Sequence, residues 1–427
     1  MKEKIRRYKS INLGEVTIPH FFSHAKGCYI YTSRGDAVLD FTSGYGVTNT
    51  GWLHPKVIQV IRQQLKKSTY CPPWLATELA LELSEVILEM VPKGLTACLR
   101  STGGSEAIER TLRAVSALTG KNTLISFNRS YHGGTAKSIR ISDYETFNLA
   151  EIPINSQHFL KIPFPGIYDF NNNGGLAITE SESLNILEKI LNTEPDIAAF
   201  IAEPIIGSGG VLIPPEGFLL KIEDMCRRHG ILFIVDEVIT GFGRIGKFTA
   251  SEIMKLTPDA LVFAKGMGGG YIPIGCAVLN EDLTRILKKY QDVSPTFGWT
   301  PLACAAALAN IRVIKEEGLC EKSETFGKEL LTATKSLMET YLPNHTLEVR
   351  GKGMMVGIQL VDKRSHEPCR LLVNKLLLAM FNMGLMCSAD WNSQTIILMP
   401  PLTITPKELY KGLGIMEIVF KKYQKLN

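Results

Sequence analysis

The sequence predicts an α/β fold, with a mainly parallel β-sheet covered by helices on both faces. The first observation is that short apolar runs alternate with helical patterns along the middle of the chain, as in "ILFIVDE" and "ALVFAKG". These runs are almost continuously apolar, which is typical of strands buried on both faces of a parallel sheet. The second observation is that polar residues follow the strands directly: Thr102, Glu203, Asp236 and Lys265. Ligand sites in such sheets form at the carboxyl ends of the strands, so we expect a site at this edge.

The length of the chain and the patterns near its two ends predict a second, smaller unit. A chain of 427 residues is longer than one compact core usually serves, so two domains are expected. From about Ala303 a long helical pattern leads away from the sheet, and "LEVRGKGMMVGIQL" and "TIILMPPLTITPKEL" then suggest an α+β arrangement. The N-terminal "KGCYIYTSRGDAVLDFTSG" alternates as strands do and has a turn at Arg34–Asp36. We expect it to pack with the C-terminal part of the chain.

Composition excludes several classes of protein. Lys plus Arg exceed Asp plus Glu by only 47 to 42, which is too small and too dispersed a surplus for a nucleic-acid-binding protein. No apolar run is long enough to cross a bilayer, and the basic start Met1 to Lys9 lacks the apolar region of a signal peptide. The nine cysteines are scattered without a CxxC pair, so we expect reduced thiols, a cytoplasmic location and no metal site.

A glycine-rich turn at the start of a strong helix suggests a binding site for an anion. In "LRSTGGSEAIERTLRAV" a strand is followed by Gly103, Gly104 and Ser105 and then by a long helical pattern. The backbone N–H groups at a helix N-terminus favour phosphate or carboxylate. The alternative is an ordinary helix cap made by Thr102 or Ser105, with the glycines serving the turn.

Charged residues that end two apolar strands are candidates for chemistry. Asp236 and Glu237 follow "ILFIV". A buried carboxylate at this place is costly without a partner. Because alternate residues of a strand point to opposite faces, Asp236 and Glu237 are expected to lie on opposite sides of the sheet. Lys265 comes 29 positions after Asp236, about one strand–helix–strand unit, and ends "ALVFA" before a series of glycines. An ammonium group in apolar surroundings has a lowered pKa and becomes an amine nucleophile. The alternatives are an ion pair of the acidic residues with Arg244 and an ordinary solvated lysine.

Together these features fit pyridoxal phosphate. The lysine would form a Schiff base, the carboxylate would keep the pyridine nitrogen protonated, and the helix N-terminus would bind the phosphate. Tyr131 in "SYHGGT" adds a ring that could stack on the cofactor; the alternative is a partly buried core tyrosine.

The motifs resemble those of the class III (omega-type) aminotransferases, which are pyridoxal-phosphate enzymes of fold type I. The resemblance runs from about Asp40 to Thr405 and is carried by "STGGSEAIE", "YHGG", "AEPIIGSGGV", "DEVITGFGRIGKF", "PDALVFAKGMGGGYIPIG" and "TFGWTPLACAAALA". It implies a large cofactor-binding domain over residues 51–305, with a mainly parallel seven-stranded sheet. It also implies a smaller α+β domain formed by residues 1–50 and 306–427.

The resemblance assigns two catalytic residues and a phosphate site. Lys265 would hold the cofactor as a Schiff base, and Asp236 would contact its pyridine nitrogen. Gly104 and Ser105 would bind the phosphate through the start of the helix.

The rest of the implied cofactor site comes from five further residues. Tyr131 would stack on one face of the cofactor ring, and Val238 would pack against the other. Glu203 would lie beside the substrate pocket, and His132 belongs to the same motif as Tyr131. Thr296 matches a family threonine that reaches the phosphate of the neighbouring subunit, which implies a homodimer with shared sites, or a tetramer that contains such dimers.

Two departures from the family pattern bear on the substrate. Relatives that bind amino acids have Arg where this chain has Gly134, and a second Arg is usual where this chain has Ile397. Neither residue can hold a carboxylate in fixed geometry as a guanidinium group does. Ornithine, acetylornithine and 4-aminobutyrate are therefore expected to be poor donors, unless a mobile arginine such as Arg140 or Arg364 moves in.

Other departures concern the shape of the pocket. Ile239 replaces a glutamine that contacts the cofactor ring oxygen in many relatives, and Trp299 and Thr300 replace the usual residues of the following loop. Tyr45 and Trp52 would form an aromatic entrance, or else pack in the core.

The resemblance implies an aminotransferase. It would move an amino group from an amine donor, with the amine terminal or otherwise distant from a carboxylate, to a 2-oxo acid such as pyruvate or 2-oxoglutarate. A racemase, aminomutase or decarboxylase of the same family is the alternative, because the cofactor residues are shared. A nucleotide-dependent oxidoreductase is disfavoured, because neither "GMGGG" nor "GSGG" has the GxGxxG order with an acidic residue about 20 positions on. The pairing of Asp236 with Lys265 argues against a non-catalytic binding module.

Overall fold

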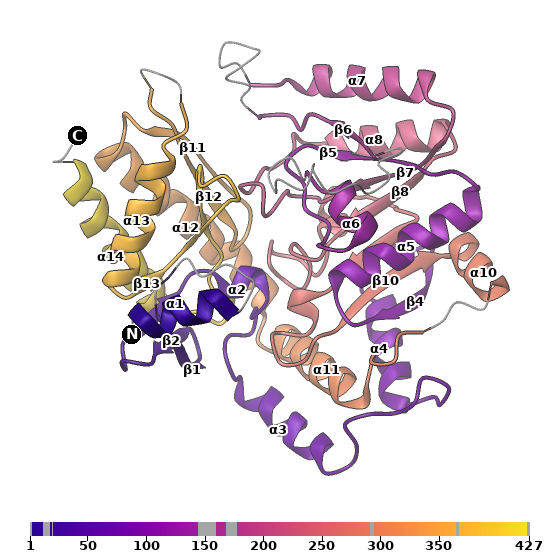
Figure 1. Cartoon of the computed structure of the whole chain (residues 1–427), viewed down its shortest axis with the longest axis horizontal. Helices are drawn as coiled ribbons and strands as arrows, with labels where there is room; N and C mark the ends of the chain where they lie inside the picture. The colour runs from indigo at the N-terminus through magenta and orange to yellow at the C-terminus, as the bar shows by residue number, and fades with distance from the viewer. Residues whose placement is uncertain are drawn as a thin grey trace.

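A seven-stranded β-sheet forms the centre of the molecule (Figure 1). The computed structural model describes residues 2–11, 18, 20–143, 159–167, 177–290, 294–363 and 367–424. In spatial order the strands are β4 (Leu95–Ser101), β10 (Gly275–Asn280), β9 (Ala260–Phe263), β8 (Leu232–Asp236), β7 (Ile197–Ala202), β5 (Thr123–Phe127) and β6 (Phe159–Ile162). The five strands from β9 to β6 run parallel, and β10 is antiparallel to both of its neighbours. The predicted mainly parallel sheet is therefore confirmed.

Helices cover both faces of this sheet because its strands are apolar on both sides. In β8, Phe233 and Val235 face one core and Ile234 faces the other. One face packs against α5 (Gly104–Thr119), α6 (Ala136–Ile141) and α10 (Glu281–Lys289). The opposite face packs against α4 (Glu78–Leu88), α7 (Glu180–Thr193), α8 (Phe218–Arg228) and α11 (Pro301–Glu316).

Two four-stranded sheets lie beside the central one. The first has the order β1 (Phe22–Lys26), β2 (Tyr29–Thr32), β3 (Ala37–Asp40) and β13 (Leu385–Met386). The second has the order β11 (Thr346–Gly351), β12 (Val356–Leu360), β15 (Thr395–Leu398) and β14 (Ser388–Ala389). They pack with α12 (Leu319–Tyr341), α13 (Arg370–Asn382) and α14 (Pro406–Gln424).

The N-terminal segment packs with the C-terminal part of the chain, as expected. β3 pairs in parallel with β13, with Leu385 opposite Leu39 and Met386 opposite Asp40. Both chain ends lie on this side of the molecule in Figure 1. The remaining elements are α1 (Lys2–Ile11), α2 (Ser43–Gly46), α3 (Pro55–Leu65), α9 (Ala250–Met254) and η3 (Lys265–Met267). None of the described helices combines the length and the apolar composition needed to cross a membrane.

Arg244 connects these parts of the molecule. Its guanidinium group is fully buried and donates to the carbonyl oxygens of Met354 and Pro400, at 2.9 and 2.6 Å, and to Asn49 Oδ1 at 2.6 Å. A further bond at 3.2 Å reaches Ser43 Oγ. Burial without a carboxylate in contact lowers the pKa of Arg244 to about 9. The alternative of an ion pair between Arg244 and the acidic residues that follow β8 is therefore wrong.

Candidate active site

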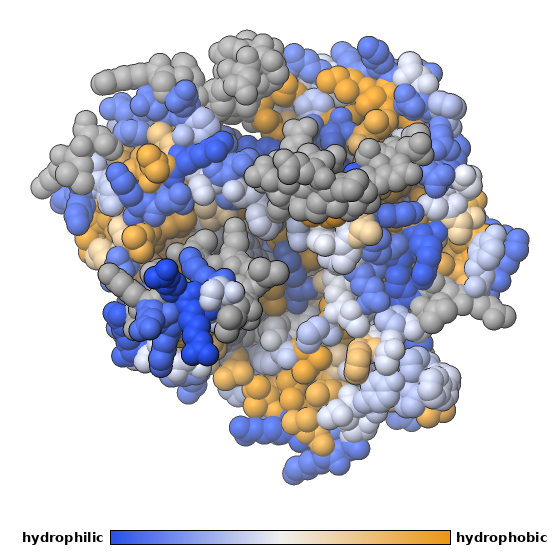
Figure 2. All heavy atoms as spheres, viewed as in Figure 1, coloured by the Kyte–Doolittle hydropathy of each residue, from blue (hydrophilic) through white to orange (hydrophobic). Residues whose placement is uncertain are grey.

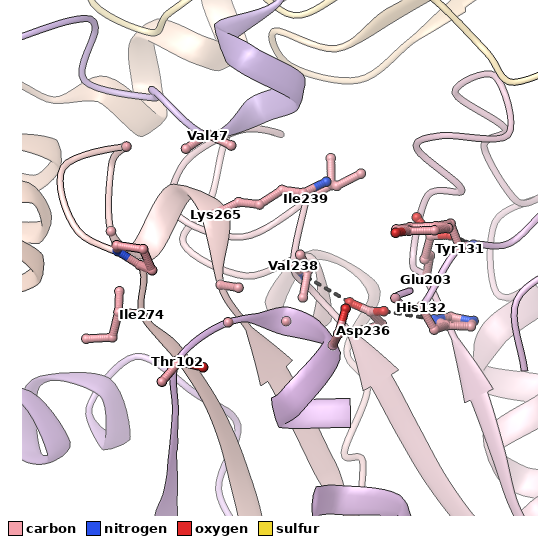
Figure 3. A pocket seen from close by; sticks show the side chains of 18 of the residues that line it. Val47, Thr102, Tyr131, His132, Glu203, Asp236, Val238, Ile239, Lys265 and Ile274 are labelled. Atoms are coloured by element: carbon pink, nitrogen blue, oxygen red, sulfur yellow. Dashed lines mark hydrogen bonds and ion pairs between the residues drawn. The ribbon is translucent and has the colours of Figure 1, made fainter. Parts of the chain in front are cut away.

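The carboxyl ends of the central strands enclose one cavity of about 390 Å³. Every predicted site residue except Thr296 lines it: Gly104, Ser105, Tyr131, His132, Glu203, Asp236, Val238 and Lys265. They come from the ends of strands β7, β8 and β9, from the start of α5 and from the loop after β5. In Figure 3 the side chains of Lys265, Asp236 and Val238 face the same space. Thr296 lies on the exposed surface of the single chain.

Lys265 is half-buried at the wall of the cavity. It follows the buried strand β9, and its φ of +37° lies in the left-handed region, at the start of a turn rich in glycine. Its side chain extends to the wall of the cavity (Figure 3). Burial lowers the pKa of its ammonium group, and the nearby carboxylates of Glu203 and Asp236 oppose that change. This setting differs from that of a fully solvated surface lysine, and it suits an amine nucleophile.

Asp236 is positioned by a histidine. Its Oδ2 lies 2.8 Å from Nδ1 of His132, and its Oδ1 accepts a hydrogen bond of 3.0 Å from the backbone N–H of Val238. Both the aspartate and the histidine are buried. Glu237 points to the opposite side of the sheet and accepts hydrogen bonds from the backbone N–H groups of Ala250 and Ser251. Asp236 therefore presents a buried, oriented carboxylate to the cavity.

Glu203 holds the loop that carries Tyr131. Its two carboxylate oxygens accept hydrogen bonds of 2.9 Å from the backbone N–H groups of Tyr131 and Gly207. Burial, together with the charge of Asp236, raises the pKa of Glu203 to about 8. The Tyr131 side chain is half-buried, and burial raises the pKa of its hydroxyl group.

The start of α5 has the form of an anion-binding cradle. Gly103 is the N-cap residue, and no side chain caps this 16-residue helix. The Thr102 side chain donates instead to Glu106, and Ser105 Oγ accepts a hydrogen bond of 3.1 Å from the Gly134 N–H. A Cβ atom at Gly133 would lie 2.6 Å from Ser105 Oγ, so only glycine allows this close approach. The alternative of an ordinary cap by Thr102 or Ser105 is therefore wrong, and the helix N–H groups suit a phosphate.

The positions where relatives carry arginine offer no cation here. Gly134 is exposed, and Ile397 is buried on β15 in an apolar cluster with Ile239 and Met399. Among the residues that line the described cavity, Lys265 is the one lysine or arginine. Arg140 is buried on α6 and is not among the lining residues, and Arg364 lies outside the described residues.

The aromatic residues near the site have separate roles. Trp52 is half-buried and donates from Nε1 to Asp40 Oδ2 at 2.9 Å, while Tyr45 is exposed, and neither lines the cavity. Trp299 is buried and donates from Nε1 to the carbonyl oxygen of Gly275 at 2.8 Å, and Thr300 caps α11. An aromatic entrance formed by Tyr45 and Trp52 therefore stays a prediction, and neither residue forms part of the cavity wall.

Sequence reasoning missed two parts of the site. The cavity wall includes Val47 from the N-terminal segment and the stretch Ile272–Ile274 before β10, which carry no polar signal. Behind Tyr131, the ring of Trp391 lies 5.4 Å from the tyrosine ring, and Arg129 forms an ion pair of 2.6 Å with Asp390. The distance along the chain between these partners hides them from any local pattern.

Comparison with known proteins identifies the family. The family model described as aminotransferase class-III matches residues 10–420. A 5-aminovalerate aminotransferase of Pseudomonas aeruginosa is 33% identical over 413 residues, covering 94% of this chain and 93% of that protein. The chain belongs to the class III aminotransferases.

Solved structures agree with this assignment. A transaminase from the marine bacterium Virgibacillus matches with a TM-score of 0.87 and 29% identity, covering 100% of this chain and 99% of the other. An amine transaminase from an uncultivated Pseudomonas species, in its pyridoxal-phosphate-bound form, matches with a TM-score of 0.88 and 28% identity, covering 96% and 97%. The protein is a pyridoxal-phosphate-dependent aminotransferase of fold type I, which takes an amine donor and a 2-oxo acid.

The residues of the cavity fit the cofactor. A half-buried amine with a lowered pKa, a buried carboxylate and an uncapped helix N-terminus surround one space. The amine suits the aldehyde of pyridoxal phosphate as a nucleophile, and the carboxylate and the helix N–H groups suit the charges of its protonated pyridine nitrogen and its phosphate.

Proposed function

We propose that Lys265 is the catalytic amine of this aminotransferase. When bound, pyridoxal phosphate supplies an aldehyde carbon that an amine attacks and a ring that accepts electrons. Lys265 Nζ would hold this cofactor as a Schiff base and, once released, would move a proton to and from the substrate carbon. The lowered pKa of Lys265 supports this role, because the neutral amine is both the nucleophile and the base. The position of Lys265 beside Asp236 and Glu203 is the observation that carries the proposal.

We propose that the other residues orient the cofactor. Asp236, fixed by His132, would keep the pyridine nitrogen protonated. Gly104 and Ser105 would bind the phosphate with backbone N–H groups at the start of α5. Their placement around the cavity supports these roles.

The cofactor ring would lie between Tyr131 and Val238. Both residues line the cavity, and a Cβ atom at Gly104 would lie 3.3 Å from Val238 Cγ2, so Val238 packs directly against the start of α5. Glu203 would hold Tyr131 through the loop N–H.

We propose that the donor is a primary amine whose amino group is terminal or remote from any carboxylate, and that the acceptor is pyruvate or 2-oxoglutarate. The absence of a guanidinium group at Gly134 and Ile397 supports this choice, because an α-carboxylate would find no partner at these two positions. The similarity to a 5-aminovalerate aminotransferase supports a terminal amine.

We also propose a homodimer with shared active sites, in which Thr296 reaches the phosphate bound by the partner. Thr296 and Phe297 are exposed in the single chain, and Trp74 is 81% exposed. Apolar side chains also gather around α3 and α11 in Figure 2. Exposed apolar area of this kind is typical of an interaction surface.

Two further proposals concern organisation and location. Residues 51–305 would form the cofactor-binding domain, because they supply all strands of the central sheet, and residues 1–50 and 306–427 would form the smaller one. A cytoplasmic location is supported by the nine cysteines, all of which are free.

Covalent trapping with borohydride tests the central proposal. Reduction of the holoenzyme is expected to attach the cofactor to the peptide that contains Lys265, as read by mass spectrometry. The Lys265→Ala variant is expected to trap nothing and to lose nearly all turnover, whereas Lys288→Ala, an exposed control on α10, is expected to behave as the parent. Trapping on another lysine, or an active Lys265→Ala variant, would overturn the proposal.

A further inference from the structure

The turn that carries Lys265 has a conformation that its own sequence does not favour. Lys265 has a φ of +37°, in the left-handed region that residues other than glycine rarely adopt. Gly269 and Gly270 follow with φ angles of +62° and +82°. A conformation of this kind persists only where the surrounding structure fixes it. The residues that fix this turn therefore decide where the amine of Lys265 lies.

Two backbone carbonyl groups of this turn are bound by a buried asparagine. Gly266 and Met267 are buried, and among the described residues no backbone N–H group donates to the carbonyl oxygen of either. Both oxygens instead accept hydrogen bonds from Nδ2 of Asn310, at 2.8 and 3.2 Å. A primary amide has two N–H groups, one for each carbonyl oxygen. Asn310 thus completes the hydrogen bonding of the turn directly after Lys265.

Asn310 stands where an amide is otherwise unfavourable. It lies within α11 among alanine, leucine and isoleucine residues, and its side chain is fully buried. A buried amide is costly unless its hydrogen bonds are made, and asparagine favours a helix less than the alanines around it. An apolar residue would suit this buried helix better. The bonds to the turn therefore give the physical reason for an amide at this position.

A threonine of the N-terminal segment orients this amide. Thr50 Oγ1 donates to Asn310 Oδ1 at 2.8 Å, and both side chains are buried. Because the hydroxyl group holds the amide oxygen, Nδ2 faces the two carbonyl oxygens of the turn. The reverse orientation would direct Oδ1 at those carbonyl oxygens, which have no proton to donate. Thr50 and Asn310 therefore act together on the turn.

The turn also packs closely against two asparagine side chains. A Cβ atom at Gly269 would overlap with Asn310 Oδ1, so only glycine allows the turn to come so near. A Cβ atom at Gly266 would lie 2.6 Å from Asn49 Nδ2, so a second amide presses on the same turn. Loss of the Asn310 side chain would leave space into which the turn, and Lys265 with it, can move.

We propose that Asn310 is a positioning residue for Lys265, and that its amide holds the turn so that Lys265 Nζ meets the aldehyde carbon of the cofactor. There the neutral amine forms a C=N bond, and the aldehyde oxygen leaves as water with the two amine hydrogens. Asn310 is not among the residues that line the described cavity, so it acts through the turn. Asn310 and Thr50 are buried within a single chain, so the arrangement does not depend on a second subunit. The proposal rests on the proposed role of Lys265 as the catalytic amine.

The rate of cofactor attachment tests this role separately from cofactor binding. Pyridoxal phosphate is added to the cofactor-free full chain, and borohydride at timed intervals traps the cofactor attached to Lys265, as read by mass spectrometry. Asn310→Ala is expected to slow attachment about ten-fold or more, because a misplacement of about 1 Å can cost about 100-fold in rate. Pyridoxamine phosphate has the same ring and phosphate but no aldehyde to bond with a lysine. Its affinity for Asn310→Ala is expected to equal its affinity for the parent.

Variants of Thr50 test the same role without removing the amide. Thr50→Val keeps the shape of the side chain but lacks the hydroxyl group, so attachment is expected to slow roughly three-fold, as for the loss of one hydrogen bond. Thr50→Ser keeps the hydroxyl group and is expected to attach the cofactor as fast as the parent. Because both variants keep Asn310, the difference between them decides the question even where Asn310→Ala does not fold.

Ser323→Ala is the matched structural control. Ser323 is fully buried on α12, where its Oγ donates to the carbonyl oxygen of Arg244 at 2.8 Å and accepts from the backbone N–H of Met354 at 3.2 Å. This variant also loses buried hydrogen bonds, but none of them reaches the turn. It is expected to unfold at a lower denaturant concentration than the parent and to attach the cofactor at the parent rate.

Three results would contradict the role of Asn310. These are parent-like attachment in Asn310→Ala, equal attachment in Thr50→Val and Thr50→Ser, and a loss of pyridoxamine phosphate affinity as large as the loss of attachment rate. In each case attachment to Lys265 in the parent would still support the proposed function. A parent in which no cofactor attaches to Lys265 would instead overturn the catalytic role of Lys265 itself.

Discussion

His132 Nδ1 lies 2.8 Å from Oδ2 of Asp236, and both side chains are buried at the end of the central sheet. The histidine comes from the loop after β5 and the aspartate from the end of β8. The contact fixes the direction of the carboxylate, because Oδ1 is held at the same time by the backbone N–H of Val238. His132 is therefore a positioning residue for the carboxylate that faces the cofactor cavity.

Loss of His132 is expected to slow the donor half-reaction. The His132→Leu variant leaves a buried carboxylate oxygen without its partner, a cost of about 1–3 kcal/mol, or about ten-fold or more in rate. His132→Asn, which keeps an N–H donor, is expected to recover most of that rate. Stopped-flow absorbance of the bound cofactor measures the half-reaction, and His24→Gln, an exposed histidine, is the control.

The same measurement on a double variant shows whether the two residues act together. Adding His132→Leu to Asp236→Asn is expected to cost little beyond Asp236→Asn alone, because residues in contact are not additive. Additive losses would contradict a role for His132 through Asp236.

Glu203 is expected to make folding stability of the cofactor-free protein depend on pH. Its pKa is about 8 in the fold against an ordinary value of 4.5, so the folded state binds the proton more tightly. The resulting stabilisation is complete below about pH 4.5 and is lost as the pH rises to about 8. The slope approaches about 1.4 kcal/mol per pH unit inside this window.

Glu203→Gln is expected to remove this slope. Denaturant unfolding of the parent and the variant between pH 5 and 9 measures the difference, with the exposed Glu339→Gln as the control. Identical pH profiles of parent and Glu203→Gln would show that Glu203 is ionised throughout.

Arg244 is expected to contribute strongly to the free energy of unfolding, because it connects the central sheet with the smaller sheets. Arg244→Met leaves four buried or half-buried acceptors unpaired, which would lower the free energy of unfolding by about 3 kcal/mol or more. Arg244→Lys cannot reach all four acceptors and is expected to lose nearly as much. A denaturant midpoint equal to that of the exposed control Arg285→Met would refute this role.

The architecture and the edge of the sheet that carries the cofactor cavity could be predicted, because both follow from local sequence. Buried parallel strands appear as apolar runs, and a charged residue that ends such a run stands at the edge where sites form. Lys265 and Asp236 were found in this way, and the structure brings them to one cavity.

Partners of charged residues could not be predicted in the same way. Arg244 was a candidate partner for Asp236, yet Asp236 pairs with a histidine 104 positions away. Arg129 and Asp390 lie 261 positions apart and meet because the loops after β5 and β14 pack together. Periodicity describes neighbours along one element, and it contains no information on which loops meet. The left-handed φ angles of all four residues in Ser43–Gly46 were also missed, because glycine at two of four positions does not define a turn.

Exposed apolar residues of this chain, among them Phe297 next to Thr296 and also Trp74, are expected to be covered by a second copy of the chain. Trp74 is 81% exposed, and Phe297, which contacts Tyr70 at a ring distance of 5.8 Å, is 66% exposed. A glutamate in a buried apolar interface is costly, so Trp74→Glu and Phe297→Glu are expected to dissociate a parent dimer in sedimentation velocity. Leu371→Glu, at an equally exposed position on α13, is the control and is expected to remain dimeric.

If the active sites are shared between subunits, cofactor binding should weaken when the dimer dissociates. Because Thr296 is expected to reach the phosphate held by the partner, the monomeric variants should bind pyridoxal phosphate at least ten-fold more weakly than the parent. Thr296→Ala should weaken cofactor binding without dissociating the dimer, since it removes one hydroxyl group and adds no charge. Equilibrium dialysis at matched protein concentrations measures both effects. A parent that sediments as a monomer with full activity and tightly bound cofactor would show that each chain builds its phosphate site alone.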